Sequence, residues 1–142
     1  MKELNFETGL VTYLVNGKCE IAFNPADVAF VNRVFNAFDS LAQRQDHAEV
    51  EAQNADSSDL FALAEERDKF MREHIDSIFG QPVCDSIFGN MSVYALAGGL
   101  PLWCNFLMAI IDEIDEAVQK EQRAASPRVD KYMAKYAKYQ RK

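Results

Sequence analysis

The chain has 142 residues, of which 49% are hydrophobic and 11% aromatic, and its net charge is −7 from 15 basic and 22 acidic side chains. This length predicts one domain, and the apolar content argues against a disordered, collagenous or low-complexity chain. Three cysteines without a C-x-x-C spacing argue against a disulfide framework or a cysteine zinc site. Acidic residues also occupy the start of the chain, where a signal peptide needs an apolar run. We therefore expect a cytoplasmic protein.

The charges are unevenly distributed along the chain. Residues 127–142 contain six basic side chains and one acidic side chain, for a charge of +5. Residues 1–126 contain nine basic and 21 acidic side chains, for a charge of −12. Nucleic-acid binding depends on clustered Lys and Arg, so we do not expect it of the acidic body.

A β-hairpin is predicted over about residues 9–23. Two apolar runs flank Asn16-Gly17, and this dipeptide suits both left-handed positions of a type I′ turn. A lone hairpin is only marginally stable, so it should pack on the following elements or pair its edge with another chain. A homo-oligomer is therefore one expectation from the sequence.

A first helix is predicted over about residues 25–45. Asn24 is a candidate N-cap and Pro25 suits the first helical position, with Asp27 in the first turn. Apolar residues at spacings of three and four predict the buried face of this helix. They are Val28, Val31, Val34, Phe35, Phe38 and Leu41.

The next segment, about residues 45–59, is acidic and has almost no large apolar side chain. We interpret it as an acidic loop, with a frayed end of the first helix as the alternative. Apolar residues then resume at helical spacing, which predicts a second helix over about residues 59–79.

Two Phe-Gly pairs follow at an interval of nine residues, in Asp76-Ser77-Ile78-Phe79-Gly80 and Asp85-Ser86-Ile87-Phe88-Gly89. Glycine just after a helix commonly adopts a left-handed conformation. Each pair therefore predicts the end of a helix whose Phe returns to the core, with a short helix between the two pairs.

The segment from Ser86 to Ile111 contains no charged residue, so a membrane span has to be considered. A span requires about 20 continuous apolar residues, whereas Gly98-Gly99-Leu100-Pro101 interrupts this run. We therefore expect no membrane helix. A buried helix is predicted from about Pro101 to Ala124, with Trp103 in the core and Ser126-Pro127 ending the helix.

The basic tail, residues 127–142, is predicted to be an amphipathic helix. Tyr132, Tyr136 and Tyr139 share one helical face. Lys131, Lys135 and Lys138 share the adjoining face. These six residues are the candidate partner-binding site, because tyrosines supply contact area and lysines attract an acidic partner. The partner could be the acidic body or a second copy, a separate protein, or an anionic nucleic acid or membrane.

No catalytic, cofactor-binding or metal-binding residue is predicted. The two histidines, His47 and His74, lie in no ligand spacing, and phosphate-binding and hydrolase motifs are absent from the sequence. Cys84 and Cys104 have apolar neighbours, which favours buried thiols over nucleophiles. We therefore expect a protein that is not an enzyme and needs no cofactor.

These features together suggest a family. The motifs that carry the likeness are Asn16-Gly17-Lys18, a helix with Phe35, Phe38 and Asp39, then Ile78-Phe79-Gly80 and Ile87-Phe88-Gly89-Asn90, and a final apolar helix from Leu102 to Val118. Over about residues 10–120, their order resembles the small tail assembly chaperones of long-tailed phages and prophages. The acidic stretch and the basic tail have no counterpart in that pattern.

The sequence pattern predicts a mainly α protein: a small helical domain over residues 1–126 with an N-terminal β-hairpin, followed by the basic helical tail. The resemblance agrees with this prediction, because members of that family are mostly helical. It also implies a non-enzymatic chaperone in the cytoplasm of a bacterial host. Such chaperones bind the tape measure protein and keep it soluble until the tail tube polymerises around it. Two alternatives remain at this point: a structural phage tail or other virion component, and a small acidic inhibitor of a host protein.

Overall fold

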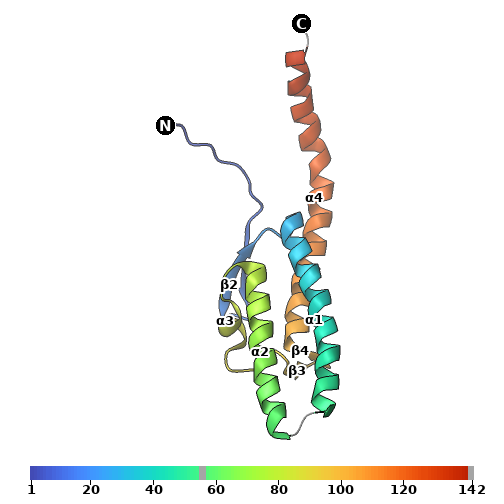
Figure 1. The fold of residues 1–142 in the computed structure, drawn as a ribbon. Helices are drawn as coiled ribbons and strands as arrows, with labels where there is room; N and C mark the ends of the chain where they lie inside the picture. The colour runs from blue at the N-terminus through green and yellow to red at the C-terminus, as the bar shows by residue number, and fades with distance from the viewer. Residues whose placement is uncertain (55–56, 141–142) are drawn as a thin grey trace.

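The computed structural model describes the backbone of residues 1–54 and 57–140, and the side chains of residues 1–43, 59–124 and 128–139. In chain order the elements are β1 (Val11–Val15), β2 (Cys19–Phe23), α1 (Val28–Asn54), α2 (Ser57–Phe79), α3 (Cys84–Phe88), β3 (Leu96–Ala97), β4 (Leu100–Pro101) and α4 (Leu102–Gln140). The fold is a small mainly α domain with an N-terminal antiparallel hairpin, as predicted. Helix α1 runs antiparallel to both α2 and α4, while the hairpin and α3 lie beside this bundle (Figure 1).

The hairpin forms where the Asn-Gly pair predicts it. Asn16 and Gly17 have φ values of 51° and 70°, so both turn positions are left-handed. The Lys18 N–H donates to the Val15 carbonyl at 3.0 Å. Strand pairing runs from Val11 with Phe23 to Val15 with Cys19, which leaves Lys18 outside the ladder.

Helix α1 begins one turn later than predicted. The Ala29 N–H donates to Asp27 Oδ1 at 3.1 Å, so Asp27 is the cap and Val28 the first helical residue. Asn24 instead stabilises the preceding turn, where its Oδ1 accepts the Ala26 N–H at 2.8 Å. The Asn24 amide also donates to the Thr8 carbonyl at 2.9 Å, an interaction with a distant segment that local pattern does not reveal.

The core lies between the hairpin and the helices, and Trp103 is 1% exposed within it, as predicted. Phe23 stacks on both Tyr13 and Phe30, with ring centroids 4.5 Å apart in each pair. The buried residues are Ile21, Phe23, Phe30, Val34, Ala37, Leu41, Met71, Ile75, Ile78, Val83, Cys84, Ile87, Phe88, Val93, Trp103, Phe106, Leu107, Ile110 and Ile114.

The predicted buried face of α1 is partly wrong. Val28 is 79% exposed and Phe35 is 46% exposed. Among the described side chains of α1, the buried residues are Phe30, Val34, Ala37 and Leu41. The sequence of α1 contains many apolar residues, so their spacing alone is consistent with more than one choice of buried face. Contact with Phe23 and Phe79 selects the face that carries Phe30.

The predicted acidic loop at about residues 45–59 is also wrong over the described part. Helix α1 continues to Asn54, and α2 begins at Ser57. Residues 55 and 56 lie outside the described residues. The stretch is rich in Ala, Glu and Gln, whose side chains lose little conformational freedom in a helix. A helix that is already nucleated can extend through such residues without burying them.

Both Phe-Gly pairs end a helix. Helix α2 ends at Phe79 and α3 ends at Phe88, and the following Gly80 and Gly89 have φ values of 69° and 59°. Phe88 is buried and Phe79 packs against the core. At Gly89 the ψ value is −130°, which lies outside the left-handed helical region. The prediction of two helix ends is confirmed, and the need for glycine follows from the positive φ.

Carboxylates of α2 hold the segment after the first Phe-Gly pair against the helix. Asp76 Oδ1 accepts the N–H groups of Val83 and Cys84, each at 2.9 Å. About two turns earlier in α2, Asp68 Oδ1 accepts the Val93 N–H at 2.8 Å. The two carboxylates therefore position both ends of the connection that contains α3.

Arg72 lies between these carboxylates and completes the attachment. Its guanidinium donates to the carbonyls of Gly89 and Met91 at 2.9 and 2.7 Å. It also forms ion pairs with Asp68 at 2.9 Å and Asp85 at 2.8 Å. The backbone after α3 is thereby fixed to α2, which supports the start of α4.

Helix α4 does not end at Ser126-Pro127. It is continuous from Leu102 to Gln140. Proline has no N–H, so the bond that would reach the Arg123 carbonyl is missing. Helix-favouring residues on both sides, including Ala124 and Ala125, keep the remaining ladder intact. In the described residues, no helix is sufficiently long and apolar to cross a membrane.

Candidate functional site

The cysteine and histidine side chains are the groups of the body that could carry chemistry, and the structure shows the surroundings of Cys84 and His74. Burial raises the pKa of the Cys84 thiol far above its ordinary value, and the neighbouring Asp76 raises it further. A thiol held in the protonated form is a poor nucleophile. His74 is half-buried against the ring of Phe70, and His47 lies outside the described side chains. Within the described parts of the chain, no group of three His, Cys, Asp or Glu side chains is arranged to hold a metal ion.

The predicted tail is the far end of α4, which projects from the body. Every described side chain from Gln119 to Tyr139 is exposed. Figure 1 shows this end of α4 extending well past the start of α1. At about 1.5 Å per residue, the exposed stretch is roughly 30 Å long. The tail is helical as predicted, and its described side chains, from Arg128 to Tyr139, do not dock on the body.

All six predicted binding residues lie on this projecting segment, and all are exposed. They are Tyr132, Tyr136, Tyr139, Lys131, Lys135 and Lys138. The ammonium group of Lys135 lies 4.8 Å from the centre of the Tyr132 ring, which is a cation–π distance. The two predicted faces therefore meet along the line between Lys135 and Tyr132. Arg141 and Lys142, at the end of the predicted tail, lie outside the described residues.

The apolar face of the tail is larger than the three tyrosines suggested. Val129 and Met133 are 55% and 58% exposed and lie beside Tyr132 and Tyr136. Val129, Tyr132, Met133 and Tyr136 follow the spacing i, i+3, i+4, i+7, which is the pattern of a helix face that packs on another helix. We call these four residues the apolar stripe. The same spacing in the sequence could have identified Val129 and Met133.

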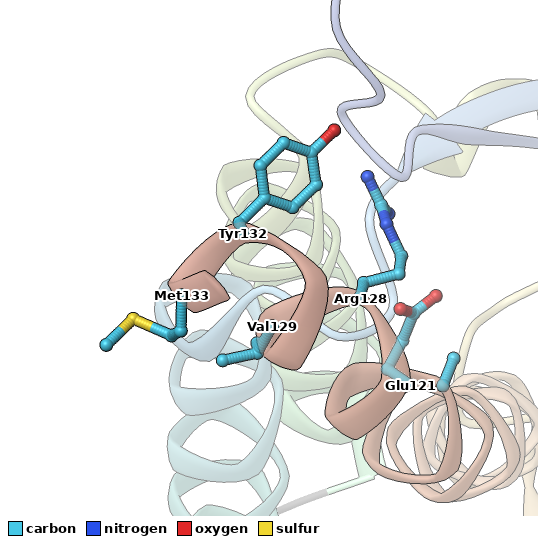
Figure 2. Close-up of a pocket in the computed structure, with 6 residues that line it drawn as sticks. Glu121, Arg128, Val129, Tyr132 and Met133 are labelled. Carbon is cyan, nitrogen blue, oxygen red and sulfur yellow. The ribbon is translucent and has the colours of Figure 1, made fainter. Parts of the chain in front are cut away.

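A shallow groove runs along the base of this stripe (Figure 2). Its lining residues are Glu121, Ala124, Arg128, Val129, Tyr132 and Met133. In Figure 2, Val129 and Met133 point to one side of α4, while Arg128 lies over Glu121 on the other. Because all its walls belong to a single helix, the groove is an open surface rather than an enclosed cavity. Such a surface suits a second helix better than a small molecule.

An acidic groove lies where α4 leaves the body. It is formed between the hairpin region and α4. Its α4 wall carries the acidic Glu113, Glu116 and Glu121 and the basic Lys120, which leaves a net negative charge. Tyr13 forms part of the opposite wall. Burial raises the pKa of Tyr13, and the charges of Glu113 and Glu116 raise it further. These carboxylates therefore create a negative potential at the base of the basic tail.

The projecting part of α4 and the acidic groove together present exposed apolar side chains and two regions of opposite charge. Exposed aromatic area and complementary charge are features that protein-binding surfaces use. The body supplies the negative groove, and the projecting helix supplies the apolar stripe and the lysines. No family model matches the chain, and neither the curated proteins nor the solved structures contain a detectable match to it.

Proposed function

We propose that this protein is a non-enzymatic chaperone of phage tail assembly that binds the tape measure protein through the projecting end of α4. The observation that supports this proposal is the exposed apolar stripe on the projecting part of α4, which no other described element covers. The order of the Phe-Gly pairs and the final apolar helix supplies the likeness to tail assembly chaperones. The likeness suggests the client, and the stripe suggests how it is held.

A long helical client could be held by a second helix that contributes one apolar face. Residues at i, i+3, i+4 and i+7 on the tail would pack into the grooves of such a helix. Tyr132 and Tyr136 supply the aromatic rings of the stripe, and Lys131, Lys135 and Lys138 would attract acidic segments of the client. The charge of −12 on residues 1–126 would keep the loaded complex from aggregating.

The direct test is co-expression with the tape measure protein encoded by the same phage or prophage. Affinity purification of the intact chain should recover the tape measure protein. A variant with Tyr132, Tyr136 and Tyr139 changed to Ala should lose this recovery, because the contact area is removed. Replacement of Lys131, Lys135 and Lys138 by Gln should slow association and reduce its dependence on salt. A matched control changes Phe61, an exposed aromatic residue of α2, to Ala.

Recovery of the tape measure protein by none of these chains would contradict the proposal. Mass spectrometry of purified virions separates the first alternative, because a chaperone should be absent from finished particles and a structural component present. Specific recovery of a host protein in place of the tape measure protein would instead favour an inhibitor.

A further inference from the structure

We propose that residues 1–8, the N-terminal arm, add as a third strand beside β1 of a second copy of this chain. The arm would lie parallel to β1, over the boundary between that strand and α4. This contact uses a surface other than the apolar stripe and goes beyond the proposed function. Three features support it: the exposure of the arm, the free edge of β1, and the match between the arm and the surface beside that edge.

The arm is an exposed, extended segment that leads away from the body (Figure 1). Leu4 is 92% exposed and Phe6 is 82% exposed. The base of the arm is held, because the Asn24 amide donates to the Thr8 carbonyl at 2.9 Å and the next residue, Gly9, has a φ value of 71°. Two large apolar side chains are therefore held in water, where a partner could cover them.

The sequence of the arm alternates as in a strand with two different sides. In an extended chain, Lys2, Leu4 and Phe6 share one side, which is basic at its start and apolar beyond it. The opposite side is polar, and its residues are Glu3, Asn5 and Glu7.

Strand β1 has an edge that can accept such an arm. Within the described residues, β2 is the only strand paired with β1. The Val15 carbonyl accepts the Lys18 N–H on the side of β2, and the direction of the backbone groups alternates along a strand. The N–H and carbonyl groups of Thr12 and Leu14 therefore point away from β2. Strand β1 contains neither Pro nor a charged residue, so its edge is open to pairing with another chain.

Two hollows follow the boundary between β1 and α4, and they differ in character. The acidic groove lies at the Val11 end of β1. A hollow of about 300 Å³ lies at the Val15 end, and Phe106 and Ala109 form part of its α4 wall. Most of its lining is apolar, and its polar lining residues are Asn16, Lys18 and Asn105.

A parallel arm matches this surface along its length. Lys2 would lie at the acidic groove and Phe6 at the apolar hollow, with Leu4 between them. Lys2 and Phe6 are four residues apart, which is roughly 13 Å in a strand. On the α4 side, Glu116 of the groove and Phe106 of the hollow are ten residues apart, which is roughly 15 Å in a helix.

The same placement pairs the backbone groups. With Lys2 beside Val11, the free groups of Thr12 face the backbone of Lys2 and Leu4, and those of Leu14 face Leu4 and Phe6. The side chains of these three arm residues then lie on the side of the sheet that faces α4. The acidic side chains of the arm point into water.

The charges select the parallel orientation, and this orientation identifies the donor as a second copy. An antiparallel arm would place Glu7 at the acidic groove and Lys2 near Lys18, so like charges would meet at both ends. Parallel strands need a connection of about a dozen or more residues. Gly9 and Leu10 alone separate the arm from its own β1, so the arm cannot lie parallel to that strand in one chain.

The test measures the mass of the intact chain by light scattering, with no client present. The mass should rise above the 16.1 kDa of one chain as concentration increases. An arm variant, Leu4→Ser with Phe6→Ser, should weaken association by about tenfold or more, because it removes the apolar contact. An edge variant, Thr12→Pro, should also weaken association, because it removes an N–H that points away from β2 and leaves the β1–β2 ladder intact.

A mixture of the two variants gives the sharpest result. The arm variant retains an open edge, and the edge variant retains an intact arm. The mixture should therefore form a species of two chains and nothing larger, although each variant alone stays monomeric at the same concentration.

Matched controls change the same segments without touching the contact. Glu3→Ser with Asn5→Ser alters the opposite side of the arm, and Thr12→Val keeps the edge N–H. Both controls should associate as the unchanged chain does. Circular dichroism and Trp103 emission verify folding, and the arm variant alters only side chains that are already exposed.

Charge reversal tests the orientation. Lys2→Glu should weaken association by about threefold, and adding Glu113→Lys with Glu116→Lys in the same chain should restore it. Lys69→Glu, an equal change of charge at an exposed site on α2, should have no effect. Equal effects of Lys2→Glu and Lys69→Glu would refute the parallel placement.

Three further results would overturn the inference: a monomer at every concentration, association that the arm variant retains, or a mixture without a two-chain species. The apolar stripe is unchanged in every variant, and no measurement uses the tape measure protein. Self-association and recovery of that client are therefore refuted independently of each other.

Discussion

Removal of the Asp76 carboxylate tests how the connection around α3 is held. Asp76 Oδ1 accepts two backbone N–H groups, from Val83 and Cys84, at 2.9 Å each. Val83 and Cys84 are 1% and 0% exposed, so water does not readily replace the lost acceptor. Asp76→Ala would leave both donors without this partner at the N-terminal end of α3.

The magnitude follows from these two contacts. An unsatisfied buried donor costs about 1–3 kcal/mol, and loss of a helix cap costs about 0.5–2 kcal/mol. Because the two N–H groups share one acceptor and can partly relax, we expect Asp76→Ala to lower the free energy of unfolding by about 2–4 kcal/mol. For a chain of this size, the melting temperature should fall by about 6–16 °C.

Asp76→Asn is the matched control. The Asn side chain has the same shape and retains one carbonyl oxygen as an acceptor, so it should cost only about 1 kcal/mol. Urea titration followed by circular dichroism and Trp103 emission measures both variants. A change below about 0.5 kcal/mol for Asp76→Ala would refute the reasoning, because an ordinary surface substitution has that effect. Equal losses for Ala and Asn would show that the hydrogen bonds are not the cause.

Three further predictions concern other parts of the fold. Trp103→Ala should lower the free energy of unfolding by about 3–5 kcal/mol, measured by denaturant titration with circular dichroism, because Trp103 is buried beside Phe38; a loss below about 1 kcal/mol would contradict its place in the core. Burial raises the pKa of Cys84 above its ordinary 9.0, so the unfolded chain loses this proton first and stability should fall as pH rises above 9.0. In Cys84→Ala, the free energy of unfolding should fall less steeply with pH above 9.0. The same slope in the variant and the unchanged chain would contradict this role of Cys84. Pro127→Ala should strengthen α4 by restoring the bond to the Arg123 carbonyl, so helical circular dichroism near 222 nm should persist to a higher temperature, and an unchanged melt would contradict this.

Several features were predictable because neighbouring residues determine them. The Asn16-Gly17 turn depends on the φ preferences of two residues, and it formed where expected. Phe79-Gly80 and Phe88-Gly89 end their helices for a similarly local reason. The six tail residues also lie on an exposed helix because their spacing sets their faces whether or not anything packs on them.

Other features depend on contacts between residues far apart in the sequence. The buried face of α1 was misassigned because several apolar residues compete, and the stacking of Phe30 on Phe23 decides between them. Arg72 contacts backbone 17 and 19 residues away, at Gly89 and Met91, and no local spacing marks such a role.

The length of α4 most clearly separates what the sequence determines from what tertiary contacts determine. The sequence by itself determined that both halves of α4 favour a helix and that Pro127 lacks one N–H. Whether the helix stops there depends on the sum of the bonds on both sides, since helix propagation is cooperative and one missing bond does not decide it. Only the tertiary structure decided where the body ends beside α4. The body leaves the described side chains of α4 uncovered from Gln119 onward, which turns an amphipathic pattern into an exposed surface.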